Sequence, residues 1–99
     1  MIIDLTKYDI EAEIAKFDSV KMRGNRVLIS PFQLPEMYEL RDYLELGLVV
    51  DIGSTTYCKV GDWITYDLTE GGSSLIVNGH LAIMTSTMYI NIIKIKSEK

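Results

Sequence analysis

The strongest local signal in this chain is the stretch from 75 to 84, which reads Leu75-Ile76-Val77-Asn78-Gly79-His80-Leu81-Ala82-Ile83-Met84. An Asn-Gly pair stands between two apolar runs, and both residue types tolerate the positive φ angles of a two-residue turn. The stretch therefore predicts a β-hairpin whose turn is Asn78-Gly79.

Short apolar runs rich in β-branched and aromatic residues occur on both sides of this hairpin, and turn residues separate them. The runs are Val27 to Ile29, Leu48 to Ile52, Trp63 to Tyr66 and Met88 to Ile95. Closely spaced strands with glycine-rich turns and only one leading helix predict an all-β fold, built as a small β-barrel or sandwich.

The first nineteen residues carry a helical pattern instead. The apolar residues at helical spacing are Ile10, Ile14 and Phe17. They predict a short amphipathic helix from Lys7 to Phe17, and Thr6 with Asp9 resembles a capping box at its start. Because so short a helix is marginal alone, it must dock. It either covers an edge of its own domain or contacts a neighbouring subunit or another protein.

The chain length fits one β-domain over residues 20–99, with residues 1–19 as a helical extension. Within that domain, the segment 31–46 departs from the strand pattern. Ser30-Pro31 stops the first run, and two prolines at the start of the segment exclude a regular central strand. Residues after Pro35 fit a helical turn or two. A connection this long in a small barrel is uncommon and usually functional or mobile, and this one carries apolar residues that loops normally avoid.

Charge and composition exclude several classes of protein. The chain has 10 Lys and Arg against 14 Asp and Glu, a formal charge of −4, so it has no general attraction for nucleic acid or anionic lipid. No apolar stretch is long enough to cross a bilayer, and no secretory signal is visible. A single cysteine, Cys58, excludes an internal disulfide and any zinc site with two thiolates. We therefore expect a cytoplasmic protein that binds neither nucleic acid nor membrane.

Residues with catalytic potential are few. His80, the sole histidine, stands beside the hairpin turn, where surface histidines are common, and a lone cysteine such as Cys58 before a strand is usually part of the core. Gly71-Gly72-Ser73-Ser74 lacks the strand and helix of a phosphate-binding loop. Trp63 and Tyr66 lie among acids, whereas a nucleic-acid-binding barrel needs exposed aromatics beside basic residues. The sequence predicts no catalytic residue, no metal site and no cofactor, and hence no enzyme.

Four stretches in order resemble a known family. They are Gly24 to Pro31, Gly47 to Gly53, Lys59 to Tyr66 and Leu81 to Ile90. The first is similar to Gly-Asp-Arg-Val-Leu-Val-x-Pro, the second to Gly-x-Val-x-x-Val-Gly, and the third to Val-Lys-Val-Gly-Asp-x-Val-x-Phe. With the closing Leu-Ile-Met pattern of the fourth, the chain from Val20 to Ile95 resembles the GroES-type (chaperonin-10) co-chaperonin family.

The resemblance implies a small GroES-like β-barrel that assembles into a homo-oligomeric ring of seven. It implies that the first strand of one subunit pairs with the last strand of its neighbour. The subunit-interface residues would be Val20, Met22, Tyr89, Ile90, Ile92 and Ile93. It also implies that the long loop binds a chaperonin, with ATP bound by that partner, to assist protein folding. The partner-binding loop residues would be Phe32, Leu34, Met37, Tyr38, Leu40, Leu44 and Leu46.

Two departures from the family leave a second hypothesis open. The loop has no glycine before Gly47 and lacks the family's apolar tripeptide, and the turn from Ser54 to Cys58 is much shorter than the family's roof hairpin. The alternative is a structural or assembly protein, for example a component of a viral particle, that reuses the barrel and employs the loop and the helix as assembly surfaces.

Overall fold

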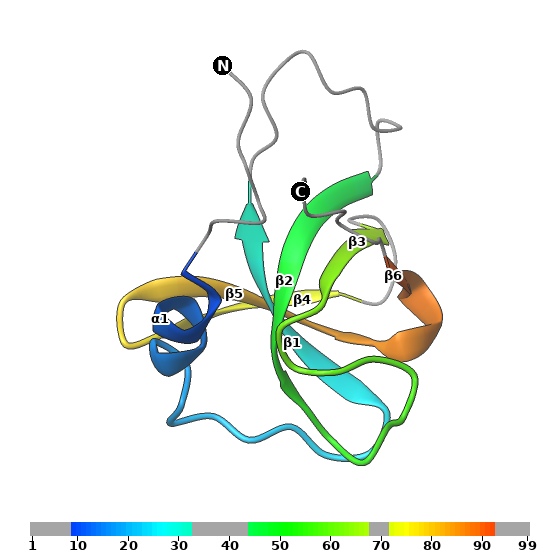
Figure 1. Cartoon of the computed structure of the whole chain (residues 1–99), viewed down its shortest axis with the longest axis horizontal. Helices are drawn as coiled ribbons and strands as arrows, with labels where there is room; N and C mark the ends of the chain where they lie inside the picture. The colour runs from blue at the N-terminus through cyan, green and yellow to red at the C-terminus, as the bar shows by residue number, and fades with distance from the viewer. Residues whose placement is uncertain (1–8, 33–43, 68–71, 93–99) are drawn as a thin grey trace, which may run out of the picture.

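The protein is a single antiparallel sheet of six strands with one short α-helix, described by a computed structural model over residues 9–32, 44–67 and 72–92. The elements are α1 (Ile10–Ala15), β1 (Arg26–Phe32), β2 (Leu44–Ile52), β3 (Trp63–Asp67), β4 (Ser73–Val77), β5 (His80–Ser86), the 3-10 turn η2 (Thr87–Tyr89) and β6 (Ile90–Ile92). The strand order is β4-β5-β1-β2-β3-β6, so the predicted all-β fold class is confirmed (Figure 1).

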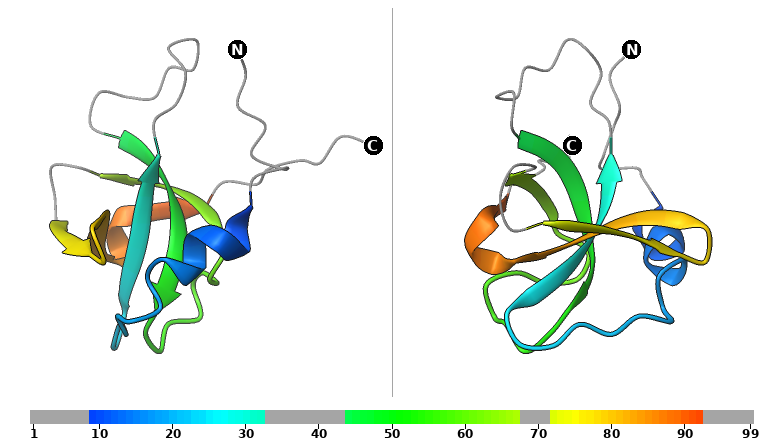
Figure 2. Two further views of the ribbon diagram at one scale, coloured as in Figure 1. Left: turned by 90° about the vertical axis from the view of Figure 1, so that its left-hand side faces the viewer. Right: turned by 180° about the vertical axis from the view of Figure 1, so that it is seen from behind.

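The hairpin predicted at 75–84 is confirmed. Strands β4 and β5 pair from Ser73 with Met84 down to Val77 with His80. The two turn residues have positive φ, 50° at Asn78 and 80° at Gly79, which is the geometry that Asn-Gly favours between right-twisted strands. Beyond its pairing with β1, which ends at Ile83, the hairpin projects toward α1 (Figure 2).

The central strands β1 and β2 are longer than predicted. Their register continues to the pair Phe32 and Leu46, so the expectation that Ser30-Pro31 ends the first strand is wrong. The reason is position: β5 pairs with β1 only as far as Ile29, so Pro31 has a strand neighbour on one side only. A proline is tolerated at such an edge-like position because its missing N–H costs no ladder bond on the open side. The segment between the two strands is therefore 33–43 rather than 31–46.

Alternate residues of the strands fill two cores on opposite faces of the sheet. We call the first the helix-side core; its buried members are Phe17, Leu28, Leu46, Leu48, Val50, Trp63, Val77 and Ala82. The second core is made of Val27, Ile29, Val49, Cys58, Ile64, Tyr66 and Ile90. Both faces of the central strands are thus buried, which explains why the runs around Leu28 and Val49 are continuously apolar.

Helix α1 is shorter than the predicted Lys7 to Phe17 and begins at Ile10. Asp9 is its N-cap, because its side chain accepts a hydrogen bond from the Ala12 N–H at 3.0 Å. Ile10, Ile14 and Phe17 pack against the helix-side core, and α1 lies across β1 and β2 (Figure 2). Of the two hypotheses for the helix, the structure therefore favours the one in which it covers its own domain.

The strand predicted from Met88 to Ile95 begins later than expected. Met88 and Tyr89 belong to η2, and β6 starts at Ile90 and pairs with β3. In the described part of the chain, no helix has the length or the apolar character needed to cross a bilayer.

Candidate interaction surfaces

The ends of the β1–β2 connection are anchored in the protein's own core. Phe32 and Leu46 face each other across the ladder. Leu46 is 2% exposed, and the Phe32 ring meets Trp63 edge-on with ring centroids 5.0 Å apart. Both were predicted to contact a partner, yet both pack within the chain. The other predicted loop positions, Leu34, Met37, Tyr38, Leu40 and the side chain of Leu44, lie outside the described residues.

The segment from Val20 to Arg23 has the alternation of a strand. Val20 and Met22 pack against the helix-side core, whereas Lys21 and Arg23 are exposed. The Met22 N–H donates to Oδ2 of Asp51 at 2.6 Å. No ladder joins this segment to any strand within residues 9–32, 44–67 and 72–92. The segment therefore has a fixed inner side, and its outer side pairs with no strand among the described residues.

A close backbone approach holds the end of this segment in place. The Ser54 N–H donates to the Gly24 carbonyl at 2.8 Å, and the Gly53 N–H donates to the Arg26 carbonyl at 3.1 Å. A Cβ at position 53 would lie 2.4 Å from the Gly24 oxygen, so only glycine allows the two chain segments to meet here. The glycine that ends the second family-like stretch thus fixes the N-terminal segment against the end of β2.

The predicted interface residues at the C-terminal end have different surroundings. Ile90 is 3% exposed in the second core, Tyr89 is half-buried and Ile92 is exposed, while Ile93 lies outside the described residues. Strand β6 pairs with β3 through Ile64 to Tyr66, and its other edge pairs with no strand in the part of the chain that the structure describes. Ile92 is therefore available to a second molecule and Ile90 is not.

Several large apolar side chains outside these predicted sites are exposed. They are Tyr57, Val60, Ile76, Leu81 and Met88. Ile76 and Leu81 are direct partners in the β4–β5 ladder, so they form one apolar pair near the hairpin turn. Sequence reasoning placed Ile76, Leu81 and Met88 on strands but did not identify them as a surface. A signal was present, because the sequence from Gly71 to Ile93 contains no Asp, Glu, Lys or Arg.

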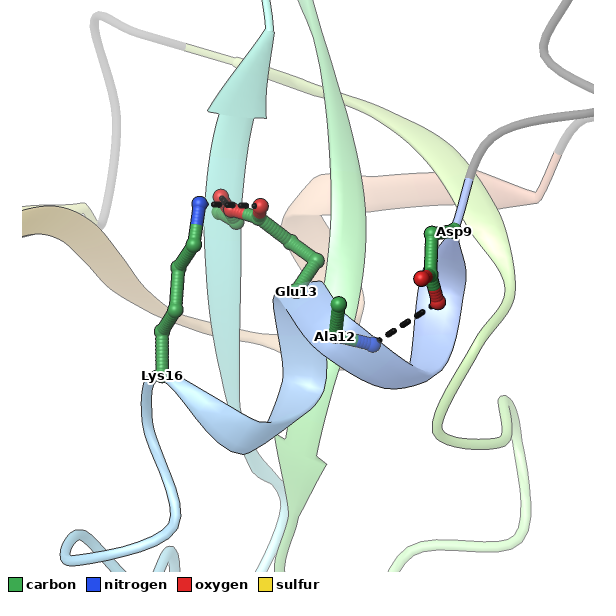
Figure 3. A network of polar contacts seen from close by, with 5 residues as sticks. Asp9, Ala12, Glu13 and Lys16 are labelled. Atoms are coloured by element: carbon green, nitrogen blue, oxygen red, sulfur yellow. Dashed lines mark hydrogen bonds and ion pairs between the residues drawn. The ribbon is translucent and has the colours of Figure 1, made fainter.

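Helix α1 is attached to the sheet by buried polar contacts as well as apolar ones. The carboxylate of Glu13, 7% exposed, accepts hydrogen bonds from the Ser30 hydroxyl of β1 and from Lys16 Nζ, the latter at 2.9 Å (Figure 3). A buried carboxylate is stable only with such partners. The short Glu-to-Ser contact therefore fixes the helix directly beside the strand that leads into the connection.

The hairpin turn is fixed to the other end of the helix. Asn78 Nδ2 lies 3.4 Å from the Lys16 carbonyl and 3.3 Å from the Ser19 hydroxyl, to both of which it donates. The rings of Phe17 and His80 meet edge-on with centroids 6.1 Å apart. The hairpin tip is thus held from the helix side, and its opposite side presents Ile76 and Leu81.

Two buried side chains with nucleophilic potential, Cys58 and Tyr66, have a raised pKa. Burial, and secondarily the nearby charge of Asp62, raises the pKa of the Cys58 thiol above its ordinary value. Burial, with a smaller contribution from Glu45, raises the pKa of Tyr66 to about 12. Cys58 belongs to the second core, whereas the His80 ring contacts Phe17 of the helix-side core, so the two do not form a catalytic pair. Within the described ranges, no three metal-binding side chains lie together.

No protein-family model and no curated protein matches this chain.

Proposed function

We propose that this chain is a divergent co-chaperonin, a ring-forming lid that binds an ATP-bound chaperonin through the connection between β1 and β2 and so assists protein folding. The observation that carries the proposal is that the core of the protein holds both ends of this connection. The two central strands stay paired up to Phe32 and Leu46, and both residues pack inward. The segment 33–43 therefore departs from a rigid base.

The sequence of that segment supports a docking role. Leu34, Met37, Tyr38 and Leu40 provide apolar side chains for a partner, whereas Phe32 and Leu46 provide the anchor. One such contact is weak. A ring that presents the same segment several times gains affinity for the chaperonin through effective concentration. Because each single contact is weak, the ring can still dissociate when the chaperonin leaves its ATP-bound state.

Ring formation is supported by the two unmatched edges. The Val20–Arg23 segment has strand-like alternation, and β6 has an edge with no strand among the described residues. Pairing the first with the second in a neighbouring copy would satisfy both. Because the two surfaces differ, such contacts run head to tail and can close into a ring. A GroES-like barrel and a cytoplasmic location belong to the same proposal.

The test is nucleotide-dependent binding to a purified double-ring chaperonin, measured by size-exclusion chromatography with mass detection. We expect the chain to co-elute with the chaperonin in ATP and not without nucleotide. The variant Leu34→Ser/Met37→Ser/Leu40→Ser should lose co-elution, whereas the control Val60→Ser, which removes an exposed apolar group elsewhere, should keep it. Absence of co-elution of the unmodified chain would end the proposal.

A structural or assembly role is the second candidate, and the exposed pair Ile76 and Leu81 favours it, because it is an apolar surface away from the connection. Limited proteolysis separates the two functions. Cleavage between residues 33 and 43 of the isolated protein, with protection once the chaperonin is added, supports the lid. Protection in an oligomer of this chain without chaperonin supports the assembly protein.

A further inference from the structure

Among the described residues, four exposed large apolar side chains lie at the two ends of the sheet, apart from Tyr57 and Val60. At the β4 end, Ile76 is 67% exposed and Leu81 50%; at the β6 end, Met88 is 74% exposed and Ile92 39%. Strands β4 and β6 are the outermost strands of the described sheet. The molecule thus has two apolar ends, and they are not alike.

Both ends lie within the charge-free stretch from Gly71 to Ile93. All the formal charges of the chain, which sum to −4, lie before or after this stretch. The net charge of −4 works against the association of two copies, and a contact through uncharged surfaces brings no like charges together. The two ends of the sheet are such uncharged surfaces. We therefore take a second copy of this chain as the partner that contacts them.

The edge strands also lack charged residues and prolines, two features that often prevent association at a sheet edge. Neither Ser73–Val77 nor Ile90–Ile92 contains a charged residue or a proline. The hairpin tip is held rigidly by the contacts of Asn78 with Lys16 and Ser19, so it needs little ordering when it binds. A preformed apolar tip without protective charges is suited to packing against a complementary end.

We propose that Ile76 and Leu81 of one copy pack against Met88 and Ile92 of the next copy. This inference rests on the proposed ring and adds a second contact to it, beside the pairing of β6 with the Val20–Arg23 segment. The order of elements makes the two contacts compatible. Ile92 belongs to β6, and Ser19, next to Val20, binds Asn78 of the hairpin. A neighbour that reaches the Val20–Arg23 segment therefore also comes close to the hairpin.

The experiment measures the assembly of the full chain over a range of concentrations by native mass spectrometry and sedimentation. The variants are Ile76→Ser/Leu81→Ser at one end and Met88→Ser/Ile92→Ser at the other. The control is Val60→Ser, an exposed apolar residue outside both pairs; Tyr57 is left in place because its hydroxyl donates to the Ile90 carbonyl of β6 at 3.5 Å. Each side chain lost from the contact should raise the subunit dissociation constant about tenfold, so each end variant should show a rise of about a hundredfold. The control should assemble like the unmodified chain, and urea unfolding should show all variants folded.

Mixing the two end variants tests whether the contact runs head to tail. Each variant retains one intact end, so a 1:1 mixture should pair through the two intact ends at a lower concentration than either variant alone associates. A ring that is unchanged in the Ile76→Ser/Leu81→Ser variant would overturn this inference and leave the proposed function standing. An unmodified chain that stays monomeric at all concentrations would overturn the proposed function itself.

Discussion

Replacing Gly47 by alanine should destabilise the protein at the centre of its sheet. Gly47 lies in β2, opposite Pro31 of β1 and Ile64 of β3. A Cβ at this position would lie 2.2 Å from Cγ2 of Ile29 and 3.1 Å from Cε1 of Tyr66. The first distance is more than an ångström short of van der Waals contact. Ile29 is fully buried and its β-branched side chain has a restricted χ1, so the methyl group can move aside only through a costly change of rotamer or a shift of the backbone.

The size of the effect follows from two opposing contributions. Overpacking a close-packed core costs about 1–3 kcal/mol, and occasionally more. Loss of backbone freedom in the unfolded chain gives back roughly 0.4–1 kcal/mol. We expect the free energy of unfolding to fall by about 2 kcal/mol, which for a domain of this size lowers the melting temperature by roughly 8–16 °C.

The assay is urea unfolding followed by the fluorescence of Trp63, the sole tryptophan, which is buried in the helix-side core. The matched control is Gly72→Ala, whose Cβ would lie 3.5 Å from Ile83 Cγ2, an ordinary contact. The control should change stability by less than about 0.5 kcal/mol. In an Ile29→Ala background, Gly47→Ala should cost less, because the clashing methyl group is gone. Equal stability of the two glycine variants would refute the packing argument.

Three further predictions concern single side chains. Burial raises the pKa of Tyr66 to about 12, so the unfolded chain loses this proton at a lower pH than the folded protein does. The contribution of Tyr66 to the free energy of unfolding is therefore complete below about pH 10 and falls by roughly 2–3 kcal/mol between about pH 10 and 12. The urea midpoint of the Tyr66→Phe variant should not show that fall. Cys58 should react with a thiol reagent at least about a hundredfold more slowly in the native protein than in urea, and equal rates would contradict its burial. Glu13→Ala leaves the buried Ser30 hydroxyl without its acceptor and should cost about 1–3 kcal/mol in urea unfolding, whereas Glu11→Ala, on the exposed side of α1, should be nearly neutral.

Much of the fold was predictable because its signals are local. The Asn78-Gly79 turn and the β-branched runs on either side of it specify a hairpin from neighbouring residues alone, and the structure has that hairpin. The end of β1 was not predictable in this way. Whether Pro31 stops a strand depends on which strands lie beside it, and β5 pairs with β1 only as far as Ile29.

The candidate sites show the same division. The sequence does not distinguish an apolar residue near a loop that faces a partner from one that faces the core of its own chain. For this reason Leu46 and Phe32 were predicted to contact a partner, although both pack inward. Ile76 and Leu81 were predicted as ordinary strand residues, and only the projection of the hairpin beyond β1 leaves them exposed.

By itself, the order of residues determined the fold class, the hairpin, the amphipathic helix and the charge-free stretch, because periodicity, turn chemistry and charge are properties of adjacent residues. The tertiary structure decided which apolar side chains are buried and which are exposed, and it joined Glu13 to Ser30 and Asn78 to Lys16. Such contacts depend on the distance between segments far apart in the chain, and that distance is set only when the whole sheet and its helix pack together.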